Sequence, residues 1–148
     1  MPIRAVVDTN VLVSGLIGER SGHSPPCQIV DAWLAGRYTL VISLLQVEEL
    51  HHVLTYPRIA NLIRLEDSEL EMILAALLSE VDLVPGRLYL AGVTRDPKDD
   101  HLVACAKEGQ ADYIVSGDQD LMVLGKYEGI QIVSPREFVE SVLADEEG

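Results

Sequence analysis

Short, nearly continuous runs of apolar residues recur along the chain and alternate with longer amphipathic segments. Runs of about four or five apolar residues are typical of strands that are covered on both faces. Longer segments with one apolar face are typical of helices that pack on a sheet. We therefore predict four strands, at Ile3–Val7, Tyr38–Ile42, Tyr113–Ser116 and Ile130–Val133.

Capping signals mark where three helices begin. Ser43–Gln46 and Ser134–Glu137 both have the pattern of a capping box, and Asp96–Pro97 places a capping residue before a proline at the first helical position. The first helix is expected to close at Pro57, the one from Asp96 near Gly109, and the last near Leu143.

Two other segments carry apolar residues at helical spacing. Gln28–Leu34 stops at Gly36, and Ser68–Val81 is the most apolar helix, which is expected to form a hairpin with Pro57–Leu65. We interpret Ser68–Val81 as a core helix, or as a dimer contact if its second face is exposed. The region before Gln28 predicts a loop, because it contains Gly15, Gly18, Gly22, Pro25 and Pro26.

Alternation of strands with helices predicts an α/β fold with a mostly parallel sheet and helices on both faces. A chain of 148 residues is expected to form one domain over residues 1–144, followed by a frayed acidic tail at 145–148.

Cysteine usage and hydropathy predict a reduced, cytoplasmic setting. Cys27 and Cys105 lie far apart and form no C-x-x-C pair. No stretch approaches the roughly 18 apolar residues of a membrane span, so no membrane association is expected. The net charge of −13 counts against a broad, non-specific surface for nucleic acid, but not against an acidic pocket that holds metal ions.

Acidic residues fall at one edge of the predicted sheet. Asp8 follows the first strand directly, and Asp118 follows the third predicted strand through Ser116-Gly117. Glu49 and Asp99 lie near the starts of predicted helices. Sites in open parallel sheets form beyond the carboxyl ends of the strands, so these four acids are expected to converge.

Converging carboxylates need compensation, because two charges 4 Å apart repel by roughly 4 kcal/mol at an effective dielectric of 20. Carboxylate oxygens with waters suit Mg²⁺ or Mn²⁺, which recruit phosphates. The pattern therefore favours metal-assisted phosphodiester hydrolysis.

Each acid also has a purely structural interpretation. Asp99 can be the residue at the N3 position of a capping box begun by Asp96, and Asp8 and Asp118 can be turn residues. Glu49 can be a surface ion-pair partner. Helical phase places Glu49 at the edge of the apolar face with Leu45 and Val53, and places Glu48 on the polar side with His51 and His52.

A zinc site is an alternative use of the helix after Asp96. His101 and Cys105 are four residues apart, a spacing that can hold zinc with two further ligands from His23, Cys27, His51 or His52. Cys105 can equally be a small core residue.

Four segments, in order, resemble the PIN-domain family. They are VVDTNVLVSGL from Val6, SLLQVEELHHVL from Ser43, RDPKDDHLVACA from Arg95 and ADYIVSGDQDL from Ala111. Their order and spacing are similar to those of the branch described as toxins of toxin–antitoxin pairs.

The resemblance implies a three-layer α/β/α, Rossmann-like fold and cleavage of single-stranded RNA with Mg²⁺ or Mn²⁺. By motif, it implies a catalytic and metal-binding set, which is Asp8, Glu49, Asp99 and Asp118. Asn10 and Ser116 resemble residues that orient the first and last of these acids, and Asp120 resembles a frequent additional acid. Asp96 and Asp100 are supporting residues, with Asp100 the alternative to Asp99.

The candidate contacts to RNA are few. The basic candidates are Arg4, Arg20, Arg58, Arg95 and Lys98. Arg95 and Lys98 are expected near the pocket because they flank Asp96, and His101 is expected at its rim. The expected partners are an RNA substrate, a cognate antitoxin protein and a second copy of the chain.

Two other functions fit the same acids. A phosphatase can form an aspartyl-phosphate on Asp8, although such enzymes usually need a second acid where this chain has Asn10. Alternatively, a domain of this fold can be a non-catalytic module, which binds RNA or a protein partner without cutting. Trapping a phosphorylated Asp8, or a failure to bind Mn²⁺, distinguishes these alternatives.

Overall fold

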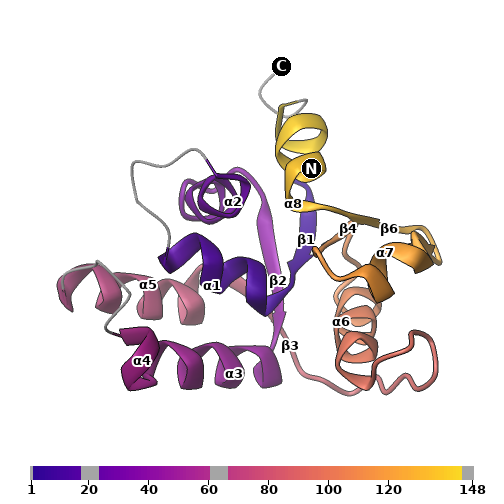
Figure 1. Cartoon of the computed structure of the whole chain (residues 1–148), viewed down its shortest axis with the longest axis horizontal. Coiled ribbons are helices and arrows are strands. Elements are labelled where there is room, and N and C mark those ends of the chain that lie inside the picture. The colour runs from indigo at the N-terminus through magenta and orange to yellow at the C-terminus, as the bar shows by residue number, and fades with distance from the viewer. Residues whose placement is uncertain (1, 18–23, 61–66, 145–148) are drawn as a thin grey trace.

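A central sheet of six strands organises the computed structural model, which describes residues 2–17, 24–60 and 67–144 (Figure 1). The strands lie in the order β3-β2-β1-β4-β6-β5, and all neighbours are parallel except β5 and β6. Their bounds are β1 (Arg4–Val7), β2 (Thr39–Ser43), β3 (Val81–Val84), β4 (Tyr113–Val115), β5 (Lys126–Tyr127) and β6 (Ile130–Val133).

Side chains alternate between two apolar cores on the two faces of the sheet. Val7 packs in one core and Val6 in the other, and Ile42 and Val41 divide in the same way. Both members of each pair are fully buried. A strand buried on both faces has no polar positions, which explains the continuous apolar runs in the sequence.

Helices cover both faces and complete three layers. The first core is closed by helices that include α1 (Thr9–Ile17), α2 (Pro25–Leu34), α3 (Leu44–Thr55), α5 (Asp67–Ser79) and the π-helix η1 (Phe138–Leu143), which continues the short α8 (Pro135–Glu137). The second core is closed by α6 (Pro97–Glu108) and α7 (Gln119–Leu124). The predicted α/β/α class with a mostly parallel sheet is confirmed.

The four predicted strands and the capped helices are confirmed to within a few residues. The side chains of Ser43, Asp96 and Ser134 each accept a hydrogen bond from a backbone N–H in the first turn of the following helix. The short α4 (Pro57–Ala60) covers the start of the segment Pro57–Leu65, and residues 61–66 lie outside the described part of the chain, so the hairpin with the next helix stays a prediction. The acidic tail at 145–148 also lies outside it.

The predicted loop around Gly15 is wrong, because residues 9–17 form α1. A Cβ on Gly15 would lie 2.4 Å from the Pro26 carbonyl oxygen of α2, so the glycine permits close packing of two helices. Gly18 and Gly22 lie outside the described residues.

Besides α1, three further elements were not predicted from the sequence, namely β3, α7 and β5. Val81 was assigned to the preceding helix, which ends at Ser79, and begins β3. On α5, Ile73, Ala76 and Leu77 are buried and Met72 is exposed. The helix therefore packs one face in the core, as predicted.

The chain changes direction across the sheet between β1 and β4. From β1 the following strands β2 and β3 are added on one side, whereas β4 and β6 lie on the other. Val7 is paired with Val115, so Asp8 and Ser116 leave the sheet side by side at its carboxyl edge. A ligand site is expected at such a switch point.

Candidate active site

A cleft of about 680 Å³ lies at this carboxyl edge, and the four acids of the predicted set all line it. Asp8 follows β1, Glu49 lies on α3, Asp99 on α6, and Asp118 follows β4. The acids come from segments far apart in sequence. The structure therefore brings these carboxylates to one cleft.

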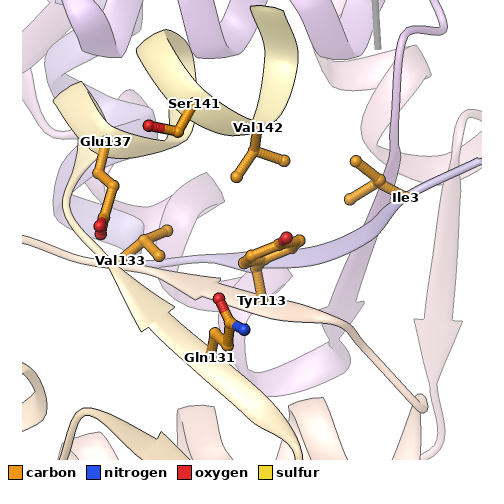
Figure 2. A pocket seen from close by; sticks show the side chains of 7 residues that line it. All are labelled: Ile3, Tyr113, Gln131, Val133, Glu137, Ser141 and Val142. Carbon is orange, nitrogen blue, oxygen red and sulfur yellow. The ribbon is translucent and has the colours of Figure 1, made fainter. Parts of the chain in front are cut away.

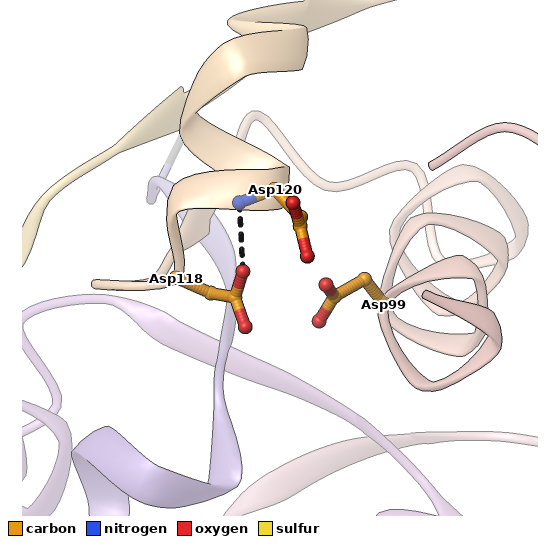
Figure 3. A group of neighbouring side chains, drawn as sticks. All are labelled: Asp99, Asp118 and Asp120. Carbon is orange, nitrogen blue, oxygen red and sulfur yellow. Dashed lines mark hydrogen bonds between the residues drawn. The ribbon is translucent and has the colours of Figure 1, made fainter. Parts of the chain in front are cut away.

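Three carboxylates form the tightest cluster in the described part of the chain. Single oxygens of Asp99, Asp118 and Asp120 lie within 4.8 Å of one another (Figure 3). Asp118 is the N-cap of α7, and its Oδ1 accepts a 2.8 Å hydrogen bond from the backbone N–H of Asp120. Asp120, expected only as an additional acid, thus belongs to the cluster that would hold a metal ion.

Asp99 is buried in an electrostatically unfavourable position. Its side chain is 5% exposed, and its Oδ2 has no hydrogen-bond partner among the described residues. Burial raises the pKa of Asp99 to about 6, with further contributions from the negative charges of Asp118, Asp96, Asp8 and Asp120. A buried carboxylate without a partner is costly, and a cation at the cluster would supply that partner.

The structural interpretation of Asp99 as a capping-box member is not supported. The backbone N–H of Asp96, which such a residue would bind, donates instead to Thr94 Oγ1 at 3.1 Å. Asp96 caps α6 through a 3.0 Å bond from the Lys98 N–H. Asp99 therefore has no role in the helix cap that would explain its burial.

Ser116 joins the two acids that follow the central strands. Its hydroxyl donates to Asp8 Oδ2 at 2.8 Å and accepts from the Asp118 backbone N–H at 3.0 Å. The backbone N–H of Asn10 lies 3.3 Å from Asp8 Oδ1, and the exposed Asn10 side chain lines the cleft. Asp8 is thus held in one orientation by residues on both sides.

Another wall of the cleft is formed by α3, from Leu45 to His52. Glu48 and Glu49 are both exposed and both line the cleft, as does His52, so the predicted separation of the two glutamates by helical phase is wrong. Leu45, predicted for the apolar face, is half exposed. Glu49 shares the cleft but lies outside the three-aspartate cluster.

Gln46 also lines the cleft from α3 and was not predicted as a site residue. The Ser43 hydroxyl accepts from its backbone N–H, but its side chain turns away from the helix cap and donates to the Val7 carbonyl at 2.5 Å. Its Oε1 is buried without a partner among the described residues. Gln46 therefore ties α3 to the end of β1, immediately before Asp8.

Asp100 has a different environment from its neighbour. It is buried, and its two oxygens accept hydrogen bonds from the Thr94 and Gly92 backbone N–H groups at 2.7 and 3.1 Å. Burial acts to raise its pKa, but the hydrogen bonds from Thr94, Gly92 and Val93 outweigh it and lower the pKa. Asp100 anchors the segment before α6, which explains its burial without a metal.

A family model described as a PIN domain matches residues 4–120, which is more than half of the chain. The chain belongs to the PIN-domain family. A search of the curated proteins found no match. PIN domains are generally metal-dependent nucleases, and the three-aspartate cluster is consistent with that chemistry.

The donor set of this PIN domain fits a hard divalent cation. Asp99, Asp118 and Asp120 supply carboxylate oxygens, the ligands that Mg²⁺ and Mn²⁺ prefer. The unpartnered Asp99 Oδ2 is an observation that a bound ion would account for.

Zinc is a poor fit to this PIN domain. Burial raises the pKa of the Cys105 thiol to about 12, so the thiol stays protonated at neutral pH and is a poor ligand. Among the described residues, no cluster of three metal-binding side chains includes a histidine or cysteine.

Few cations surround the cleft. Lys98 and His101 line it, and Arg95 Nη1 lies 4.0 Å from Asp120 Oδ1. Arg4, a predicted RNA contact, instead pairs with Asp82 and donates to the Gly109 carbonyl, at the opposite end of β1 from Asp8. Arg58 lies on α4, outside the cleft lining, and Arg20 lies outside the described residues.

A separate hollow of about 250 Å³ lies between the last helix and the sheet, and has a different character (Figure 2). Glu137 and Ser141 line it from the helical side, and Tyr113 and Gln131 from the strands. It contains one carboxylate and shares no lining residue with the acid cleft.

No described helix is long and apolar enough to cross a membrane.

Proposed function

We propose that this PIN domain is a Mg²⁺- or Mn²⁺-dependent endoribonuclease that cleaves single-stranded RNA. One observation carries the proposal: Asp99 Oδ2 is buried without a partner beside Asp118 and Asp120, in a cleft that Asp8 and Glu49 also line. A cluster of this kind accumulates negative charge that folding alone does not compensate. A divalent ion and the phosphate it recruits give the cluster a use.

The chain's own residues have distinct parts in the proposed reaction. Asp99, Asp118 and Asp120 would hold the ion, and the Ser116 hydroxyl holds the Asp8 carboxylate in one orientation. Glu49, exposed on the α3 wall, orients the attacking water. When bound, the ion supplies Lewis-acid chemistry, which lowers the pKa of water and offsets phosphate charge.

Because water attacks the phosphorus atom, the ribose 2′-hydroxyl is not needed and no cyclic phosphate forms. The resemblance to PIN domains implies that the bond to the ribose 3′-oxygen breaks and that this oxygen leaves with a proton. The proposed products therefore carry a 5′-phosphate and a 3′-hydroxyl. Lys98, His101 and Arg95, which lie at or beside the cleft, contact the strand.

In the cell, we propose that this nuclease acts as the toxin of a toxin–antitoxin pair. The four PIN-like segments have the order and spacing of the toxin branch, which supports a cognate antitoxin as protein partner. A second copy of the chain is a further proposed partner. Induction of the protein should arrest growth, and co-expression of a small protein encoded beside it should relieve the arrest.

Cleavage of a fluorescent single-stranded RNA tests the activity. Wild-type protein should cut this RNA in the presence of Mn²⁺ or Mg²⁺, and EDTA should abolish the cleavage. The variant Asp8→Asn should be inactive, and its circular dichroism spectrum should match that of wild type. Calorimetric titration with Mn²⁺ tests the metal site separately. No binding at millimolar concentration overturns the metal site and favours a non-catalytic module. Binding without cleavage, combined with phosphate trapped on Asp8, favours the phosphatase alternative.

A further inference from the structure

A second hollow, of about 270 Å³, adjoins the acid cleft on the side of β3 and α6. Ser43, Leu45 and His101 line both spaces, so the hollow opens beside the candidate active site. Its size lies just below that of pockets for drug-sized ligands, which suits one flat ring system. This hollow is called the side pocket from here on.

Exposed apolar side chains concentrate around the side pocket. Tyr89 is 78% exposed, and Leu44 and Leu45 are 52% and 50% exposed. These are three of the eight large apolar side chains found exposed in the described part of the chain. Apolar surface gathered beside a polar cleft indicates a binding surface rather than random exposure.

The segment that carries Tyr89 is held to α6. The Glu108 carboxylate accepts hydrogen bonds from the Gly86 and Arg87 backbone N–H groups, at 3.0 to 3.1 Å. Gly86 has a φ of +79°, which favours glycine at this turn. Tyr89 therefore follows a backbone segment that is hydrogen-bonded to α6, and its exposed ring is available as a stacking surface.

Charge argues for a flat, uncharged occupant. The chain carries a net charge of −13, and the cations at the acid cleft are few. Phosphate contacts alone would then hold a nucleic acid weakly. Proteins that bind single strands also obtain affinity from bases that stack on aromatic side chains, which needs no positive charge.

We propose that the side pocket binds one unpaired nucleobase of the substrate strand, stacked on Tyr89, while the adjoining phosphate lies at the aspartate cluster. This inference rests on the proposed ribonuclease function, which it deepens by adding a residue that selects unpaired substrate. A base inside a duplex is covered on both faces and cannot enter, so the side pocket favours single strands.

Steady-state cleavage of a short RNA tests the role of Tyr89. Tyr89→Ala should raise KM about 5- to 100-fold, with kcat within about twofold of wild type, because stacking contributes mainly to binding. Tyr89→Phe keeps the ring and should match wild type. Tyr56→Ala, which removes another exposed tyrosine outside both spaces, should also match it. An unchanged KM in Tyr89→Ala overturns the inference.

A photochemical experiment keeps the inference testable if the protein cuts no RNA. An oligoribonucleotide containing 5-iodouridine is irradiated with wild-type protein in EDTA, and the crosslinked peptide is sequenced by mass spectrometry. A crosslink at Tyr89, competed by unlabelled single strand but not by duplex, supports a base site even without nuclease activity. Crosslinks that avoid residues 85–89, or competition by an unrelated peptide instead, overturn it.

Discussion

The Ser116 hydroxyl donates a 2.8 Å hydrogen bond to Asp8, which lies 108 positions earlier in the chain. The two residues leave neighbouring parallel strands at their carboxyl ends. Ser116 is fully buried, and the same oxygen accepts the Asp118 N–H. One side chain thus sets the spacing between acids on either side of the switch point.

Ser116→Ala should weaken Mn²⁺ binding about 10- to 100-fold, because residues that orient metal ligands have effects of that size. The free energy of unfolding should fall by about 1–3 kcal/mol, since a buried hydrogen bond to a charged group is lost. Ser134→Ala is the matched control: it removes a helix cap, at a cost of about 1 kcal/mol, and the Ser134 hydroxyl bonds the Glu137 N–H rather than Asp8 or the Asp118 N–H. Equal Mn²⁺ affinity in Ser116→Ala and Ser134→Ala would contradict the orienting role.

Asp99→Asn should stabilise the metal-free protein. The folded-state pKa of Asp99 is raised from 3.8 to about 6, so wild-type stability falls as pH rises between these values. Above pH 6 the variant should be more stable by up to about 3 kcal/mol, and below pH 4 the two should agree. Urea unfolding in EDTA at several pH values measures the difference.

Added Mn²⁺ should reverse the order of stability, so that wild-type protein becomes more stable than Asp99→Asn. Wild-type protein gains stability because the ion binds only the folded state, whereas Asp99→Asn should gain little. A variant that is less stable than wild type in EDTA at pH 7 would show that the Asp99 charge is already compensated within the protein.

Asp100→Asn should have the opposite effect on stability. Its carboxylate accepts the Thr94 and Gly92 N–H groups, and its lowered pKa means that the stabilisation is present above the unfolded pKa and is lost as pH falls. The free energy of unfolding should fall by about 1–3 kcal/mol at pH 7. Mn²⁺ affinity, measured by calorimetry, should stay within a few-fold of wild type. A complete loss of Mn²⁺ binding would instead make Asp100 the third acid.

Local capping signals made much of this architecture predictable. Ser43, Asp96 and Ser134 begin their helices where the sequence indicated, because a cap depends on neighbours within one turn. Gly15 was misleading, since its meaning depends on α2, a different helix that packs on it. Val81 was misassigned because it continues the four-residue helical spacing of Ile73 and Leu77, and neither glycine nor proline separates it from α5.

The candidate site was only partly predictable, because part of it depends on contacts between elements that are distant in sequence. Asp8 and Asp118 follow strands, and topology alone brings strand ends together. The place of Asp120 in the cluster depends on α7, a helix of six residues that was too short to predict. Gln46 and Tyr89 are defined by contacts and exposure in the folded chain, which no local pattern records.

Glu49→Gln should lower kcat about 100-fold or more, whereas Glu48→Gln should retain activity. Both side chains are exposed on the same wall of the cleft, so the pair is matched in charge, helix and burial. The proposed difference is that Glu49 orients water at the reacting phosphate. Single-turnover cleavage in saturating Mn²⁺ separates this effect from metal binding. Equal losses in both variants would show that the wall acts only through its total charge.

RNA binding by this PIN domain should depend weakly on salt. Single-stranded binding falls with a slope of about −0.7 in log–log form for each phosphate neutralised, and Lys98 and Arg95 are the cations at or beside the cleft. The slope of log affinity against log salt, measured by fluorescence anisotropy with inactive Asp8→Asn, should therefore be about −1.4. In that background, Lys98→Gln should reduce its magnitude by about 0.7. Arg136→Gln, an exposed change near the last helix, should leave it unchanged. A slope steeper than about −4 would reveal a basic surface elsewhere and would weaken the case for affinity gained by stacking on Tyr89.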